Sequence, residues 1–379
     1  MTYLDFAAAT PIHPEVLEAM LPFYSKTYGN PSSVHSIGVA AKNAVNEARD
    51  VIAECIGAHP EEIFFTSGTT ESINLALHHF ERVIFPQTEH DATRECARNV
   101  AHRHPVVVDV EGFWKVSDII ATLEQTSPES SVVTASWVNN ELGTIGRIHE
   151  LAIAIERYNK THRPVFLHVD TAQALLDVDV DMERTPVHKL SCGAGKIYGP
   201  KGVGVLYLRK NTPRRAFMFG GKQQEHLRPG TENVPGIVGM AHACRIMIAH
   251  RQEYQQHIGA AKESFLQELQ AEKIVYRQNG PKEKTFQASH ILSLTFPGLD
   301  AEEIIFRLDA KGVCASAASA CRSGSGPSDT LKAIGLSQKD IESTVRFSFG
   351  HTLTLAEVKQ AAQLTAATIR DMMQWKKDL

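Results

Sequence analysis

The run Val165-Phe166-Leu167-His168-Val169, followed by Asp170-Thr171-Ala172-Gln173, decides the fold class. Four apolar residues and one histidine predict a buried strand, and a carboxylate directly after the strand predicts a polar site at its end. Similar short apolar runs alternate with segments of helical periodicity over about 200 residues. The strands are expected at 63–66, 82–85, 105–108, 131–136, 165–169 and 204–208, and the helices at 70–79, 91–101, 116–125 and 149–158. This alternation predicts an α/β fold with a mostly parallel sheet covered on both faces.

The pattern changes after residue 236. A long helix is expected at 236–269, followed by strands at 291–296 and 343–348 and helices at 301–311 and 355–375. This rhythm is typical of a smaller α+β domain. We expect a large domain at 16–250, and a small domain formed by 1–15 and 251–379.

Composition narrows the class of protein. The chain has 379 residues, 43% of them hydrophobic and 22% charged, which is ordinary for a globular protein and excludes a disordered one. A formal charge of −4 does not favour direct binding to nucleic acid. No apolar run is long enough to span a membrane, and the first residues lack the pattern of a signal peptide. Six cysteines without a Cys-x-x-Cys pair favour free thiols in the cytoplasm.

Three segments follow or precede predicted strands and carry polar side chains. Ser67-Gly68-Thr69-Thr70 opens a helix, so it predicts an anion site or an ordinary helix cap. Asp170 can pair with a cationic ring nitrogen, bind a metal or cap a helix. Lys196, between Gly195 and Ile197, can form a Schiff base if its pKa is lowered, or lie on the surface.

Three further side chains are candidates for chemistry. Cys321 lies among small residues beside Arg322, which favours a thiolate over a buried structural thiol. His90 follows a predicted strand and is either structural or directed to the same strand-end crevice. Arg346 lies inside an apolar strand and needs an anionic partner, which is either a substrate carboxylate or a structural carboxylate.

Taken in order, these segments resemble the cysteine desulfurases, class V enzymes of fold type I that use pyridoxal 5'-phosphate. The resemblance extends from Tyr3 to about Leu353. It is carried by these stretches: 29–36 (GNPSSVHS), 65–72 (FTSGTTES), 139–143 (NNELG), 196–202 (KIYGPKG), 230–239 (GTENVPGIVG), 319–321 (SAC) and 346–348 (RFS).

The resemblance implies roles for these residues in a conversion of L-cysteine to L-alanine. Lys196 matches the lysine that holds the cofactor, and Cys321 the thiol that accepts the substrate's sulfur as a persulfide. His90 matches an acid/base that stacks on the cofactor ring. Asp170 matches the residue that contacts the ring nitrogen, and Gln173 the donor to the phenolic oxygen. The phosphate ligands are matched by Thr69, Thr70 and Gly193, and the ligands of the substrate carboxylate by Asn140 and Arg346. Thr231 matches a phosphate ligand from the other subunit, which implies a homodimer. No metal is implied.

Some positions depart from the family pattern. Gly195 replaces a usual histidine and Gly193 a usual serine, both of which touch the phosphate, and Pro229 replaces a serine. These changes suggest a specialised member rather than the housekeeping one. A selenocysteine lyase, a cysteine sulfinate desulfinase and a non-catalytic interaction subunit are the alternatives. The sulfur acceptor remains open among an iron–sulfur scaffold, a tRNA thiolation component and a DNA phosphorothioation component.

Overall fold

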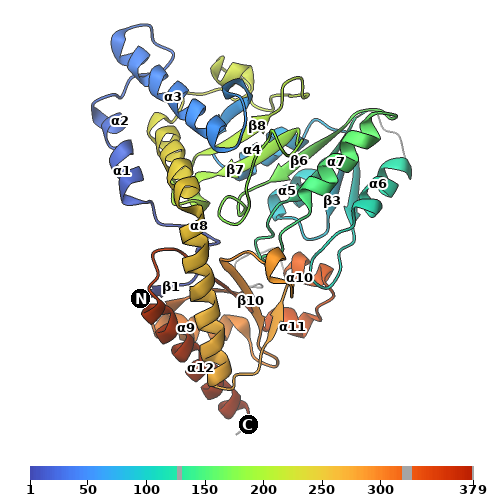
Figure 1. Cartoon of the computed structure of the whole chain (residues 1–379), viewed down its shortest axis with the longest axis vertical. Helices are drawn as coiled ribbons and strands as arrows, with labels where there is room; N and C mark the ends of the chain where they lie inside the picture. Colours follow the sequence, from blue (N-terminus) through green and yellow to red (C-terminus); the bar gives the residue numbers. More distant parts are fainter. Residues whose placement is uncertain (126–129, 318–326, 378–379) are drawn as a thin grey trace.

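A seven-stranded sheet forms the centre of the larger part of the molecule in a computed structural model (Figure 1). The model describes residues 1–125, 130–317 and 327–377. The strand order is β2-β8-β7-β6-β5-β3-β4, and only β8 runs antiparallel to its neighbours. The strands are β2 (Ile63–Thr66), β3 (Arg82–Pro86), β4 (His102–Val106), β5 (Ser131–Ser136), β6 (Val165–Asp170), β7 (Lys189–Gly193) and β8 (Gly204–Leu208). The predicted α/β class and its mostly parallel sheet are confirmed.

Helices cover both faces of this sheet because successive strand residues point to opposite sides. Val132 packs into a cluster with α4 and α5, whereas Val133 packs into the main core with α3, α6, α7 and α8. The helices of this part are α1 (Pro14–Met20), α2 (Pro22–Ser25), α3 (Ser36–Cys55), α4 (Thr69–Leu77), α5 (Asp91–Arg98), α6 (Val116–Gln125), α7 (Ile148–Asn159) and α8 (Val234–Ala271). Four short 3₁₀ helices are described, of which η2 (Ala194–Lys196) matters below.

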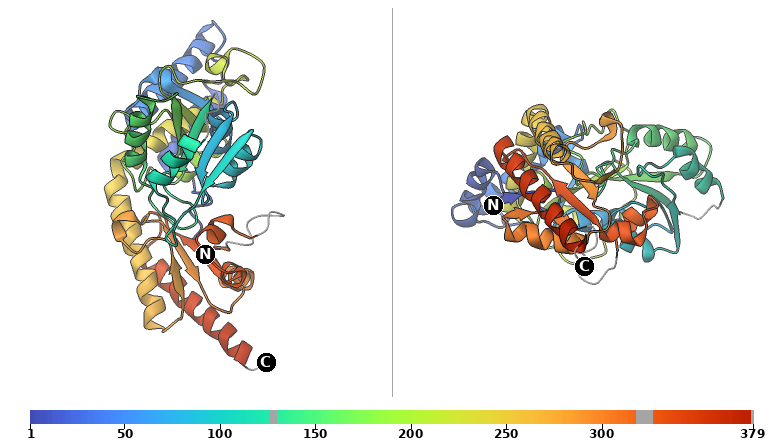
Figure 2. Two further views of the ribbon diagram at one scale, coloured as in Figure 1. Left: turned by 90° about the vertical axis from the view of Figure 1, so that its right-hand side faces the viewer. Right: turned by 90° about the horizontal axis from the view of Figure 1, so that it is seen from below.

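A second sheet has the strand order β12-β13-β10-β9. It forms the lower part of the molecule in Figure 1 and in the left view of Figure 2. Its strands are β9 (Arg277–Asn279), β10 (Ile291–Thr295), β12 (Ser316–Ala317) and β13 (Thr344–Ser348). β1 (Thr2–Tyr3) pairs with β11 (Val313–Cys314), so the N-terminus joins this part. The helices here are α9 (Ala301–Ala310), α10 (Asp329–Ala333), α11 (Gln338–Glu342) and α12 (Leu355–Lys377).

The division into two domains remains a proposal. The expected boundary at 250 falls within α8, a continuous helix that passes from the large sheet to the second sheet (Figure 1). Among the described residues, no helix is long and apolar enough to cross a membrane.

In the large sheet, two strands differ from the prediction. The strand expected at 105–108 is β4, which starts at His102 and ends at Val106. It is an edge strand with mostly exposed side chains, where Pro105 is tolerated and no apolar run is needed. β7 was not predicted, since Lys189 and Ser191 interrupt its apolar pattern. Both side chains are nevertheless buried, and Lys189 Nζ donates to the carbonyl of Ala76 at 2.8 Å.

Candidate active site

A cavity of about 570 Å³ opens where the carboxyl ends of β5, β6 and β7 meet the second sheet. Nine of the predicted site residues line it: Thr69, Thr70, His90, Asn140, Asp170, Gln173, Gly193, Lys196 and Arg346. Thr231 is exposed and does not line this cavity. Cys321 lies outside the described residues.

Lys196 reaches the cavity from the 3₁₀ turn η2 that follows β7. Its Nζ donates to the carbonyl of Ala7 at 2.9 Å and to the carbonyl of Ala8. Burial, and next the positive charge of Arg346, lower the pKa of Lys196 below its ordinary value. A lowered pKa makes the neutral, nucleophilic amine more accessible, as a Schiff-base lysine requires.

Asp170 is the last residue of β6, and its side chain is buried. The N–H of Ala172 donates to Asp170 Oδ1 at 2.9 Å, and no basic side chain among the described residues makes an ion pair with this carboxylate. Burial raises the pKa of Asp170, while the positive charges of His90 and Lys196 oppose that rise. A buried carboxylate in this position favours a cationic partner inside the cavity.

His90 is the N-cap of α5, and its Nδ1 accepts a hydrogen bond from the N–H of Ala92 at 3.1 Å. That bond assigns the lone pair to Nδ1, so the proton of the neutral ring is on Nε2. The ring is thereby held at the cavity wall, and no described residue forms a hydrogen bond with its Nε2, the nitrogen that can exchange a proton.

The N-terminus of α4 also lines the cavity. Gly68 has a φ of 152° and lets the chain turn from β2 into the helix, so that the first N–H groups and the hydroxyls of Thr69 and Thr70 line the cavity. Glu71 holds this turn, because its carboxylate accepts from the N–H of Ser67 at 2.7 Å and from Arg228 Nε at 3.0 Å. Such an arrangement favours a phosphate group.

Gly193 ends β7 directly against this helix. A Cβ atom at this position would lie 2.5 Å from Thr69 Oγ1, whereas a Cβ at Gly195 would meet nothing closer than 3.5 Å, at Lys201 Cγ. The glycine at 193 therefore makes room for the hydroxyl of Thr69.

We expect Gly193→Ala to weaken binding of pyridoxal phosphate about tenfold, because Thr69 must rotate its hydroxyl away from the phosphate. Gly195→Ala is the matched control and is expected to bind normally. Titration of the apoprotein with the cofactor, followed by absorbance, measures both. Equal affinities for the two variants would contradict this role of Thr69.

Arg346 enters the cavity from β13. Its Nη1 donates to the carbonyl of Asn140 at 2.9 Å and its Nη2 lies 3.0 Å from Asp5 Oδ1. Its Nε is buried without a partner among the described residues. The guanidinium thus has a donor left, and Asp5, a residue that sequence reasoning did not single out, orients it.

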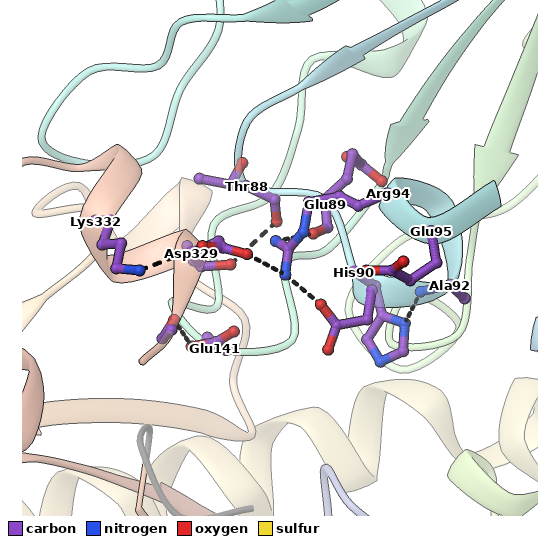
Figure 3. A network of polar contacts seen from close by, with 12 residues as sticks. Thr88, Glu89, His90, Ala92, Arg94, Glu95, Glu141, Asp329 and Lys332 are labelled. Carbon is purple, nitrogen blue, oxygen red and sulfur yellow. Dashed lines mark hydrogen bonds and ion pairs between the residues drawn. The ribbon is translucent and has the colours of Figure 1, made fainter. Parts of the chain in front are cut away.

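A polar network joins the His90 loop to the second sheet's side of the cavity (Figure 3). Arg94 Nη1 donates to the carbonyl of Glu89 at 2.6 Å, and Arg94 Nη2 forms ion pairs with Asp91 and, at 3.2 Å, with Asp329 of α10. The hydroxyl of Ser328, the N-cap of α10, donates to Glu141 Oε2 at 2.5 Å. The loops that carry His90 and Asn140 are therefore both tied to the start of α10.

Glu89 is a second residue that the sequence did not reveal. It is buried, and its carboxyl group accepts from the N–H of Ser136 and lies 2.7 Å from the Ser136 hydroxyl. Burial raises the pKa of Glu89 from 4.5 to about 8, and the charge of Asp170 adds to the rise. Between these values the folded state binds one proton more than the unfolded state, so stability falls as the pH rises through this window.

We therefore expect Glu89→Gln to raise the melting temperature by roughly 2–4 °C more at pH 8 than at pH 5. Glutamine keeps both contacts to Ser136 and has no proton to lose. Thermal unfolding at the two pH values tests this, with Glu95→Gln as the control for an exposed carboxylate on α5, the helix that follows Glu89. A difference that is the same at both pH values would contradict the raised pKa.

The residues around the cavity fit pyridoxal phosphate. Asp170 suits a protonated pyridine nitrogen, the α4 N-terminus suits the phosphate, and Lys196 supplies the amine for the aldehyde. Among the described residues, no group of His, Cys, Asp or Glu is placed to hold a metal ion. Fold and site together define a fold-type I enzyme that depends on pyridoxal phosphate.

Comparison with known proteins agrees with this class. The family model "Aminotransferase class-V" matches residues 2–361. A cysteine desulfurase IscS of Dictyoglomus turgidum is 35% identical over 361 residues, 92% of this chain and 89% of the relative. Among solved structures, a NifS-like protein has a TM-score of 0.89 at 29% identity, covering 98% of this chain and 99% of the other. A structure of SspA in complex with cysteine has a TM-score of 0.77 at 28% identity, covering 93% and 100%.

The chain belongs to the class-V aminotransferase family and, within it, to the cysteine desulfurases. It is accordingly an enzyme that depends on pyridoxal phosphate. The relatives do not favour a selenocysteine lyase, a sulfinate desulfinase or a non-catalytic subunit.

Proposed function

We propose that this enzyme converts L-cysteine to L-alanine and passes the sulfur through a persulfide on Cys321 to an acceptor protein. The observation that carries this proposal is the convergence of Lys196, Asp170, His90 and Arg346 on one cavity. The structural relative that is described in complex with cysteine supports the choice of substrate.

The cofactor, when bound, supplies an electron sink that accepts the electron pair from the substrate's Cα–H bond and later withdraws electrons from Cβ. The side chains that hold it are proposed to be Asp170 at the ring nitrogen, Gln173 at the phenolic oxygen and the residues at 69, 70 and 193 around the phosphate. Asp170 would keep the ring nitrogen protonated, since a carboxylate and a pyridinium stabilise each other's charge in a buried site.

The substrate carboxylate is proposed to bind Arg346 and Asn140. Arg346 lines the cavity and has a fixed orientation through Asp5, so its guanidinium is positioned for an anion before the substrate arrives. Lys196 and His90 both face the cavity and are the groups proposed to move protons between the substrate's carbon atoms.

Cys321 is proposed as the sulfur acceptor. β12, which ends at Ala317 four residues before Cys321, lines the cavity. The thiolate attacks the substrate sulfur, a new S–S bond forms, and the Cβ–S bond breaks with its electron pair left on the carbon skeleton. Protonation of that carbon then gives alanine.

Parallel turnover of cysteine, selenocysteine and cysteine sulfinate tests the proposed substrate. We expect cysteine to give alanine and protein-bound persulfide in equal amounts in the first turnover. Alanine from the sulfinate or selenocysteine at a higher kcat/KM than from cysteine would overturn the proposal.

A homodimer is proposed because Thr231 is exposed in one chain and does not line its own cavity. Large apolar side chains are also exposed around the first helices and in the segment before Thr231: Leu21 (55%), Tyr24 (61%), Tyr28 (66%) and Phe219 (91%). Exposed apolar surface of this kind is typical of a subunit interface.

Mixed dimers test the contribution of Thr231 to the partner's site. Thr231→Ala and Lys196→Ala protomers, refolded together, are expected to yield one intact site per hybrid dimer, with normal cofactor affinity. If Thr231 acted within its own chain, no hybrid site would regain that affinity.

The acceptor of the sulfur is proposed to be a protein of an iron–sulfur scaffold, tRNA thiolation or DNA phosphorothioation system. Capture of partners by the persulfidated enzyme, followed by tracing of labelled sulfur, distinguishes these systems. The proposed cytoplasmic location and the specialised role suggested by the residues at 193 and 195 remain predictions.

A further inference from the structure

A chain of polar groups runs behind the cavity and ends on the amine of Lys196. Asp177 Oδ2 lies 2.8 Å from His290 Nδ1, and His290 Nε2 lies 3.0 Å from Gln173 Oε1. Gln173 Nε2 donates to the carbonyl of Ala7 at 2.9 Å. The same carbonyl accepts from Lys196 Nζ at 2.9 Å. The buried carboxylate and the reactive amine are thus connected through an imidazole, an amide and one backbone oxygen.

The backbone carbonyl of Ala7 determines which groups donate and which accept along this series of hydrogen bonds. A carbonyl oxygen only accepts hydrogen bonds, so the nitrogen and not the oxygen of the Gln173 amide must face it. The amide oxygen then faces His290, and His290 Nε2 must carry a hydrogen. A ring with a bare Nε2 would place two acceptors against each other or turn the amide over.

Asp177 determines the other ring nitrogen. Its side chain is 1% exposed, and the N–H of Ser289 donates to its Oδ1 at 2.8 Å. Burial by itself would raise the pKa of Asp177, but the hydrogen bond and charge of His290, together with Ser289, lower it below the ordinary value. The ionised carboxylate only accepts, so His290 Nδ1 carries a hydrogen too. In this arrangement both ring nitrogens of His290 act as donors, Nδ1 to Asp177 and Nε2 to the Gln173 oxygen.

We propose that Asp177 and His290 are positioning residues that lock the amide of Gln173 with its second N–H directed into the cavity, as a donor to the cofactor's phenolic oxygen. This inference rests on the proposed role of Gln173. It adds that this role depends on the contact between Asp177 and His290, two residues that lie more than 110 positions apart in the sequence.

A double-mutant cycle between Asp177→Asn and Gln173→Leu tests the inference. Apoprotein is titrated with pyridoxal phosphate, and both the affinity and the absorption maximum of the bound cofactor are recorded. Asparagine can present its amide N–H instead of an acceptor to His290 Nδ1, so His290 Nε2 no longer has to donate and the amide of Gln173 is free to turn over. We expect each single variant to weaken binding roughly 2- to 10-fold and to shift the band in the same direction, and the double variant to resemble Gln173→Leu.

Asp179→Asn is the matched control, since Asp179 lies two residues further on, at the surface, and pairs with Arg184 and Arg251. It is expected to leave affinity and spectrum unchanged. If Asp177→Asn fails to fold, the variant Asp177→Leu/His290→Leu removes both hydrogen-bonding partners together and is expected to show the same shift.

Additive effects in the cycle, or an Asp177→Asn enzyme with an unchanged band, would overturn the inference while Gln173 kept its proposed role. An unchanged band in Gln173→Leu would instead overturn the proposed role of Gln173 itself. The two failures are therefore distinguished by which single variant leaves the absorption band unchanged.

Discussion

Lys196→Ala is expected to lose the visible absorption band of the bound cofactor and to lower alanine production by about 10³-fold or more. The structure gives the reason, because Lys196 brings its amine into the cavity in an environment that lowers its pKa, through burial first and Arg346 second. Absorbance of the purified protein and alanine release from L-cysteine measure the two effects.

Lys196→Arg separates the covalent role from the charge. Arginine keeps a positive group near the carbonyls of Ala7 and Ala8 but forms no Schiff base, so the same loss is expected. Thermal unfolding shows whether either variant is folded. Full alanine production by a folded Lys196→Ala enzyme would contradict the proposed mechanism.

The strands that carry the site were predictable where burial produces an apolar run. β6 was recognised because all its residues are apolar up to Asp170, apart from His168. β7 was missed because a lysine and a serine interrupt it, and their partners come from other elements. Lys189 is satisfied by Ala76 of α4, 113 residues away, which no local pattern reveals.

The same distinction applies to the site. Residues that face the cavity, such as Asp170, follow a strand directly and can be recognised from their position. The residues that orient them come from distant segments: Asp5 holds Arg346, and His290 holds Gln173. Family resemblance pointed to the first group only, because the second group acts through contacts that the fold alone creates.

The second large effect is expected from replacing the thiol that accepts the sulfur. All five described cysteines are poor candidates for a nucleophile: burial raises the pKa of Cys55 and Cys96 to about 11 and that of Cys192 to about 12, and it raises the pKa values of Cys244 and Cys314 as well. At neutral pH these thiols stay protonated and react slowly. Cys321, whose sequence neighbours are small residues and an arginine, is the remaining thiol.

Cys321→Ala and Cys321→Ser are therefore expected to keep the cofactor band and the spectral change on addition of L-cysteine, but to form no persulfide. Alanine release should fall about 10²-fold or more, because nothing removes the substrate's sulfur. Cys314→Ala is the matched control: Cys314 is seven residues earlier, Asp309 Oδ1 lies 3.7 Å from its Sγ, and burial followed by this carboxylate raises its pKa. We expect that variant to retain persulfide formation. Alanine production at the full rate by Cys321→Ala would overturn the role of Cys321, because alanine forms only if the substrate's sulfur leaves without the Cβ–S electron pair, and another acceptor would then have to take that sulfur.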